Sequence, residues 1–322
     1  MGLSLGLGPA TDRSEALAVV RSAVERGVTL FDTAEGYGPY TNEGLVGEAL
    51  QPIRDGVLVA TKFGFDINAN GETVGLSSRP GHLRKVVEAS LRRLRTDHID
   101  VLYQHRVHPD VPMEDVAGTV KELIADGKVR HFGLSEASET SICRAHAVQP
   151  VAVIQGHYSL WMREPETKKP GACQGVRIGL VAWGPLGQGF LTGGITRDMR
   201  FDNPDDLRAD FPRFTSEALQ ANFAVVDFLE DFGAEKSTSP AQLELAWLLA
   251  QKPWVVPIPG GTRLAHLDDN LPAAELELTA SDLHRINQAL GALDLVGAPL
   301  IGQPRPSSKP TAEPTHLPSW GY

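Results

Sequence analysis

Two patterns of apolar residues alternate along the chain. Short, near-continuous apolar runs, rich in β-branched residues, are separated by longer segments in which apolar residues recur every three or four positions. Continuous runs are typical of strands that are covered on both faces. Seven runs are therefore predicted to be strands: residues 28–31, 57–61, 99–103, 129–133, 151–155, 178–182 and 254–258.

The segments between these runs predict amphipathic helices with recognisable ends. Residues 12–26 begin at Asp12, with Glu15 three positions later, and stop at Gly27, which are start and stop signals of a helix. The same reasoning predicts helices at 79–95, 113–126 and 240–251 and, from weaker patterns, at 138–147, 216–232 and 280–290.

Regular alternation of strands and helices predicts parallel strands joined by right-handed crossovers. In a chain of 322 residues, this favours an α/β fold of the (β/α)8 TIM barrel type over an open doubly wound sheet. An eighth strand would have to precede the helix at 12–26, where few residues remain, so the first strand is expected to be short or missing. Six prolines lie between residues 298 and 322. We therefore expect a barrel over residues 1–295 and a Pro-rich C-terminal tail over 296–322.

Composition and charge exclude several classes of protein. The net charge is −10 and the acidic residues are scattered, which argues against nucleic acid or an anionic membrane as the main partner. No apolar run is long enough for a membrane span, and the N-terminus does not resemble a signal peptide. Cys143 and Cys173 show neither metal-ligand nor redox spacing, and two isolated thiols fit a reducing cytosol. These features predict a soluble, cytoplasmic protein.

Candidate chemistry lies where three successive strands end. Asp32 and Tyr37 follow the first predicted strand, Lys62 the second and His105 the third. Taken singly, each has an ordinary structural explanation. Together they could act on one carbonyl group, because an ammonium held by a carboxylate stabilises a phenolate, and a histidine can donate a hydrogen bond to the carbonyl oxygen. We interpret Asp32 as orienting Lys62, and Tyr37 as the proton donor.

Reduction of a carbonyl also needs a hydride source. No side chain supplies one, so a bound nicotinamide or flavin would be required. The sequence PGGTR at 259–263 offers backbone N–H groups and an arginine before a helix expected to start near 264, which indicates a phosphate site.

Glu35 is interpreted as a surface carboxylate. Four aromatic residues suggest a pocket for apolar or aromatic aldehydes: Trp161, Phe201, Phe211 and Phe214.

Several longer motifs occur in one order along the chain: DTAEGYG, TKFGF, LYQHRVHPDVPMEDV, GKVRHFGLSEA, YSLW, GPLGQGFLTG and PIPGGTR. In this order they resemble the aldo-keto reductase superfamily over about residues 2–295, and most of all its auxin-induced-like or pyridoxal-reductase-like branch. The resemblance implies a TIM barrel that reversibly reduces a small aldehyde or ketone. It also implies NADP(H) as the cofactor, with NAD(H) as the alternative.

The resemblance assigns roles to individual residues. The catalytic tetrad falls on Asp32, Tyr37, Lys62 and His105, and Trp161 on the substrate pocket. Positions that match nicotinamide contacts are Ser135, Gln155 and Trp183. Positions that match the rest of the cofactor site are Gly184, Leu186, Gly187 and Gly189, then Gly260, Gly261, Thr262, Arg263, His266, Asp269 and Asn270.

Two other functions were weighed against carbonyl reduction. A non-catalytic, cofactor-sensing or interaction subunit is suggested by the short N-terminus and by Gly184 and Gln188, which replace a serine and an arginine common in the family. A metal-dependent hydrolase would use Asp32, His105 and His108, although a second histidine pair on another strand is missing. Neither the substrate nor the oligomeric state can be read from one sequence.

Overall fold

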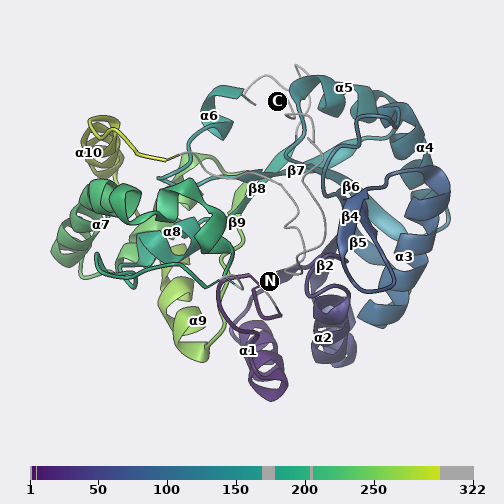
Figure 1. Ribbon diagram of the computed structural model, residues 1–322, viewed down its shortest axis with the longest axis horizontal. Coiled ribbons are helices and arrows are strands. Elements are labelled where there is room, and N and C mark those ends of the chain that lie inside the picture. Colours follow the sequence, from purple (N-terminus) through teal and green to yellow (C-terminus); the bar gives the residue numbers. More distant parts are fainter. Residues whose placement is uncertain (1, 5, 169–177, 204–205, 298–322) are drawn as a thin grey trace.

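The computed structural model describes residues 2–4, 6–168, 178–203 and 206–297. Its main sheet has seven parallel strands in the order β1-β2-β5-β6-β7-β8-β9 (Figure 1). The strands are β1 (Leu30–Asp32), β2 (Leu58–Phe63), β5 (Ile99–Gln104), β6 (Val129–Ser135), β7 (Val151–His157), β8 (Gly179–Trp183) and β9 (Val255–Pro257). All seven predicted strands are confirmed.

Helices surround the curled sheet on its outer side (Figure 1). They are α1 (Arg13–Glu25), α2 (Thr41–Leu50), α3 (Pro80–Leu94), α4 (Met113–Ala125), α5 (Glu139–Val148), α6 (Pro165–Lys168), α7 (Ser216–Lys236), α8 (Pro240–Gln251), α9 (Leu264–Asn270) and α10 (Ala280–Gly291). Within the described residues, β1 and β9 do not pair and no strand precedes α1. The expected barrel-type fold with a missing first strand is therefore confirmed, as an incompletely closed sheet.

The helix ends show which local signals were reliable. The carboxylate of Asp12 accepts hydrogen bonds from the backbone N–H groups of Ser14 and Glu15, so it caps α1 as predicted. Ser239 and Gln242 form a reciprocal capping box at the start of α8. Helix α2 was not predicted, because it is buried on most sides and lacks an amphipathic period. The hairpin of β3 (Phe65–Ile67) and β4 (Thr73–Leu76) was also missed.

Buried apolar side chains form two clusters that hold the strands in place. One joins β1, β2 and β5–β7 to helices α1–α5. The other packs α7, α8 and α10 against β8, β9 and the loop that follows β8. No helix in the described part of the chain is long and apolar enough to cross a membrane.

Two further expectations from the sequence concern the cysteines and the C-terminal tail. Cys143 in α5 is disulfide-bonded, so the interpretation of an isolated thiol at this position is wrong. Spacing along the chain does not reveal which sulfur atoms approach one another in the fold. The predicted Pro-rich tail lies almost entirely outside the described residues, which end at Gly297.

Candidate active site

A buried lysine at the end of β2 connects the predicted catalytic residues. The side chain of Lys62 has no exposed surface. Its Nζ contacts Oδ1 of Asp32 and donates hydrogen bonds to the carbonyl oxygen of Thr33 at 2.8 Å and to the phenol oxygen of Tyr37 at 3.2 Å. Strands β1 and β2 pair in parallel with Asp32 opposite Ala60, so both residues lie at the carboxyl end of the sheet. The structure thus brings Asp32, Tyr37 and Lys62 together.

The charges in this group favour a protonated lysine. Burial by itself would lower the pKa of Lys62, but the Asp32 carboxylate and Tyr37 outweigh it and raise the pKa above its ordinary value. The second carboxylate oxygen of Asp32 accepts a hydrogen bond from Nε2 of Gln155 at 2.7 Å. Gln155, a predicted nicotinamide contact, therefore supports the ion pair in this structure.

His105 faces Tyr37 from the loop that follows β5. Its ring packs against Phe65, with centroids 4.6 Å apart, and meets the Tyr37 ring edge-on at 6.0 Å. Burial, followed by the positive charges of Arg106 and Lys62, holds the pKa of His105 well below its usual range. Its Nδ1 has no hydrogen-bond partner among the described residues. A neutral imidazole in this position can donate one hydrogen bond to a bound group.

Glu35 corrects one prediction. It was expected on the surface, but it is 2% exposed, and its carboxylate accepts a hydrogen bond from the backbone N–H of Gly64 at 3.1 Å. Burial, together with the nearby charge of Glu43, raises the pKa of Glu35 to about 7. The loop after β1 folds inward against the end of β2, which its polar sequence did not indicate.

Glu136 fixes the position of Trp183 and was not recognised in the sequence. One oxygen of its carboxylate accepts hydrogen bonds from the backbone N–H of His157 at 2.6 Å and from Nε1 of Trp183 at 2.8 Å. The indole is stacked on the His157 ring, with centroids 4.2 Å apart. Glu136 adopts a left-handed backbone conformation, with φ at 51°. A glutamate after a strand looks like a surface residue in the sequence, so no signal could have revealed this role.

Ser135 lies beside a second, partly buried cation whose role was also missed, Arg106. Ser135 ends β6 and is 1% exposed. Its hydroxyl oxygen accepts a hydrogen bond from Nη1 of Arg106 at 3.3 Å, and the same nitrogen donates to the carbonyl oxygen of His105 at 2.6 Å. Arg106 follows His105 directly in the sequence, and this adjacency was the only available signal.

The loop after β8 needs glycine at two of its predicted positions. Gly184 and Gly187 have φ values of 61° and 56°. A Cβ atom on Gly184 would lie 2.9 Å from Nε2 of His157, and one on Gly187 would lie 2.8 Å from the Trp161 ring. The loop backbone is therefore held close to both rings. The other two predicted loop residues belong to the same turn, in which the N–H of Gly189 donates to the carbonyl of Leu186 at 3.0 Å.

The predicted phosphate segment surrounds the start of α9, as expected. Nδ1 of His266 accepts a hydrogen bond from the backbone N–H of Thr262 at 3.2 Å, and its Nε2 lies 2.9 Å from Nη2 of Arg263. Partial burial and the Arg263 charge lower the pKa of His266. Asp269 accepts from Gln242 at 3.3 Å. The remaining predicted residues of this segment lie just before α9 and at its end: Gly260, Gly261 and Asn270.

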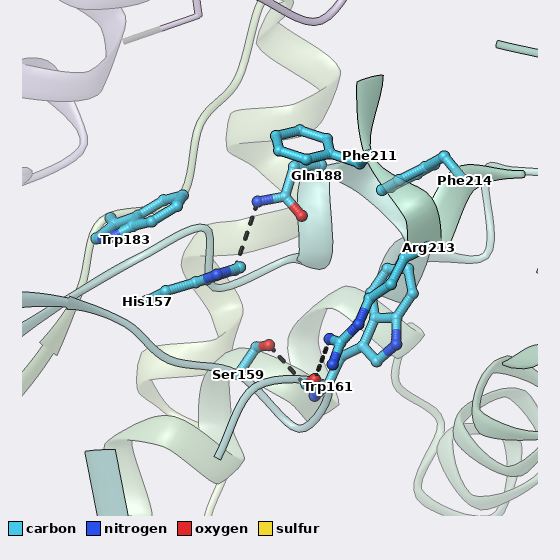
Figure 2. A pocket seen from close by; sticks show the side chains of 8 residues that line it. All are labelled: His157, Ser159, Trp161, Trp183, Gln188, Phe211, Arg213 and Phe214. Atoms are coloured by element: carbon cyan, nitrogen blue, oxygen red, sulfur yellow. Dashed lines mark hydrogen bonds between the residues drawn. The ribbon is translucent and has the colours of Figure 1, made fainter. Parts of the chain in front are cut away.

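A pocket lies beside Trp183 (Figure 2). Three of the four expected aromatic residues line it: Trp161, Phe211 and Phe214. The fourth, Phe201, packs against Phe214 with ring centroids 5.2 Å apart but is not part of the lining. The lining consists of His157, Ser159, Trp161, Trp183, Gln188, Phe211, Arg213 and Phe214. Its walls are thus mainly aromatic, with a few polar groups.

The metal-site alternative gains no support from this geometry. In the part of the chain that the structure describes, no three His, Cys, Asp or Glu side chains come together in a way that could hold a metal ion. Asp32, one of the proposed ligands, is instead engaged by Lys62 and Gln155.

Comparisons with known proteins find a matching family and similar structures. The profile of the Aldo/keto reductase family matches residues 2–290. A probable aldo-keto reductase 1 from Glycine max is 38% identical over 300 residues, which cover 92% of this chain and 85% of the relative. The glycerol dehydrogenase AKR11B4 from Gluconobacter oxydans superimposes with a TM-score of 0.82 at 27% identity, over 96% of this chain and 93% of that one. The thermostable aldo-keto reductase Tm1743, solved with the inhibitor epalrestat, superimposes with a TM-score of 0.69 at 25% identity, over 89% of this chain and 93% of that one.

Proposed function

This chain belongs to the aldo/keto reductase family, and we propose that it reduces aldehydes or ketones to alcohols with NADPH, Tyr37 being the proton donor. The observation that supports this most directly is the contact of 3.2 Å between the Lys62 ammonium and the Tyr37 hydroxyl. A phenol titrates near pH 10 and is a weak acid at neutral pH. The buried cation stabilises the phenolate that forms when the proton leaves, so the proton becomes easier to transfer.

Each of the other polar groups has a distinct part in this proposal. Asp32 holds the ammonium in place, and Gln155 holds Asp32. The neutral ring of His105 would donate a hydrogen bond to the substrate oxygen, which orients the carbonyl and stabilises the negative charge that develops on it. The phenol proton of Tyr37 then passes to the same oxygen.

The residues present fit a nicotinamide cofactor. Two of the left-handed glycines of this loop, Gly184 and Gly187, keep its backbone close to the Trp183 side of the site. Trp183 is anchored by Glu136 and is only partly buried. In this proposal Ser135 and Trp183 hold the nicotinamide end and Arg263 holds the phosphate end. When bound, the nicotinamide supplies the hydride that the protein itself lacks.

The pocket supports aromatic aldehydes as the substrate class. Four aromatic side chains line it, namely Trp161, Trp183, Phe211 and Phe214. Such walls bury a flat ring favourably and allow stacked or edge-on contacts. The predicted nicotinamide contact Trp183 belongs to the same lining, and in this proposal the ring of the substrate lies beside it.

The first experiment is an NADPH titration of the full chain, followed by nicotinamide fluorescence. 4-Nitrobenzaldehyde is then added, and NADPH consumption is recorded at 340 nm. Saturable binding followed by consumption is the expected result. Binding without consumption of any aldehyde or ketone in a panel would instead favour the non-catalytic, cofactor-sensing alternative. A folded sample that does not bind NADPH would contradict both.

A further inference from the structure

The pocket beside Trp183 contains one cation, the guanidinium group of Arg213. This residue lies in the short helical turn η4 (Pro212–Phe214) and is partly buried. Its Nη1 donates to the carbonyl oxygen of Trp161, and its Nε donates to the carbonyl oxygen of Gly297 at 2.8 Å. The guanidinium also lies over the Trp161 ring, 5.2 Å from the centroid. Figure 2 shows the group beside Trp161 at the pocket wall.

Arg213 has no acidic partner in the part of the chain that the structure describes. No ion pair within the described residues involves it, whereas Arg197 pairs with Asp227 and Arg208 pairs with Asp206, each at 2.6 Å, on the same stretch of chain. The two neutral carbonyl groups orient the guanidinium but leave its charge uncompensated. Its Nη2 makes no hydrogen bond within the described residues. A partly buried guanidinium without a counter-ion is costly for a folded protein unless a ligand supplies the counter-charge.

The other residues that line the pocket carry no charge that would neutralise Arg213. None of the eight lining residues is acidic, although acidic residues outnumber basic ones by ten in the whole chain. The pKa of His157 is lowered to about 3, chiefly by burial and further by the charge of Arg213, against a smaller opposing effect of the Glu164 carboxylate, so this ring is neutral at physiological pH. The side-chain amide of Gln188 lies 3.4 Å from the same ring and adds an uncharged hydrogen-bonding group.

We propose that Arg213 binds an anionic group of the substrate, so that the preferred substrate is an aromatic aldehyde or ketone that carries a carboxylate. The inference rests on the proposed reductase function and narrows it. The aromatic walls would hold the ring, and the guanidinium would pair with the carboxylate at the end away from the reacting carbonyl. A planar carboxylate accepts hydrogen bonds from a guanidinium better than a neutral group of the same shape does.

The test compares two substrates of nearly equal shape, 4-carboxybenzaldehyde and 4-nitrobenzaldehyde. Their intrinsic reactivities differ, so the quantity that matters is the ratio of their kcat/KM values. In Arg213→Gln this ratio should fall about ten- to hundredfold, the range expected for one hydrogen-bonded charge pair. Arg213→Lys, which keeps the charge, should retain part of the preference. The matched control is Arg197→Gln, which loses the same charge outside the pocket and should keep the wild-type ratio.

A binding measurement separates this inference from the proposed function. Calorimetry with benzoate and benzamide needs no turnover and can be carried out on the wild-type chain. Benzoate should bind at least about ten times more tightly than benzamide, and Arg213→Gln should remove the difference. If benzoate binds in this way but no carbonyl compound is reduced, the reductase proposal fails and the anion site stands.

Two results would overturn the anion site. One is equal affinity of the wild-type chain for benzoate and benzamide. The other is an Arg213→Gln variant that keeps the substrate ratio but binds NADPH more weakly, because Arg213 would then serve the phosphates of the cofactor.

Discussion

The ammonium nitrogen of Lys62 lies 3.2 Å from the phenol oxygen of Tyr37. The two residues are 25 positions apart in the sequence and come from the end of β2 and the loop after β1. The same nitrogen contacts the carboxylate of Asp32. The phenol of Tyr37 therefore faces an ammonium group that Asp32 holds in place. This relationship makes the phenol of Tyr37 the group whose removal tests the chemistry most directly.

Tyr37→Phe is expected to lower kcat for aldehyde reduction by about 10²- to 10⁴-fold, the range of a lost general acid. NADPH binding and the melting temperature should change little, because among the described residues the hydroxyl accepts one hydrogen bond, of 3.2 Å, from Lys62. Tyr40→Phe is the matched control, since that ring stacks under Arg93 at 4.5 Å and has no part in the proposed chemistry. Equal activity of the two variants would remove Tyr37 from the mechanism.

Asp32→Asn leaves the buried Lys62 ammonium without its counter-ion. We expect the free energy of unfolding to fall by about 3–5 kcal/mol, the range for removing one partner of a buried ion pair, as measured by urea denaturation. Because an uncompensated charge causes the loss, Asp32→Asn combined with Lys62→Met should be more stable than Asp32→Asn alone. A double variant that is less stable than the single one would show that the cost comes from packing.

Glu35→Gln should change how stability depends on pH. The pKa of Glu35 is about 7 in the folded protein, against a reference value of 4.5. Between these values the folded protein binds a proton that the unfolded chain has released, so wild-type stability falls as pH rises through this window, by about 3 kcal/mol in total. Thermal unfolding from pH 4 to pH 9 should show a weaker decline in Glu35→Gln. The exposed Glu277→Gln should follow the wild type.

Glu136→Ala frees the indole of Trp183 and the backbone N–H of His157 from their shared acceptor. We expect NADPH to bind about tenfold more weakly, in line with the loss of hydrogen bonds to a charged group. Glu136→Gln should have a smaller effect, because the amide oxygen can still accept from the indole. Quenching of tryptophan fluorescence by NADPH measures both variants. The same Kd in Glu136→Ala as in wild type would mean that the position of Trp183 does not matter for the cofactor.

Arg263→Ala tests the choice between NADPH and NADH. If Arg263 binds the 2′-phosphate, its loss should weaken NADPH binding by about tenfold or more and leave NADH binding nearly unchanged. A misfolded variant would bind both cofactors more weakly, so the two Kd values measured on one variant also control for misfolding. Equal weakening of both cofactors would place Arg263 at a phosphate that they share.

The strands and the grouping of the catalytic candidates were predictable because both depend on local sequence and on one topological rule. Continuous apolar runs marked every strand of the main sheet, and carboxyl ends of neighbouring parallel strands meet at one edge. That rule alone placed Asp32 near Lys62. The helix predicted at 240–251 was likewise placed correctly, as α8.

The missed features depend on contacts between distant segments. Helix α2 was not predicted because its burial on several sides removes the polar face, and Gly47 lets its backbone approach α3, where a Cβ would lie 2.4 Å from the carbonyl oxygen of Arg93. Glu35 and Glu136 look like ordinary loop acids until the folded chain surrounds them. The hydrogen bonds of Arg213 to the carbonyls of Trp161 and Gly297 join residues up to 84 positions apart. Helix and strand periodicity relates only residues that are close in the sequence, so it could not predict these contacts.

The open edge between β1 and β9 also bears on how the protein reaches its native state. Each pairing of the main sheet joins one strand to the next main-sheet strand along the chain, and only the β3–β4 hairpin intervenes, between β2 and β5. Within the described residues, no pairing joins the first strand to the last. The loop-closure cost of joining the first strand to the last is thereby avoided, and the longest step that remains is the β8–β9 pairing, which joins Leu180 to Val255. The sheet can therefore grow strand by strand in the order of synthesis, without waiting for both ends of the chain to meet.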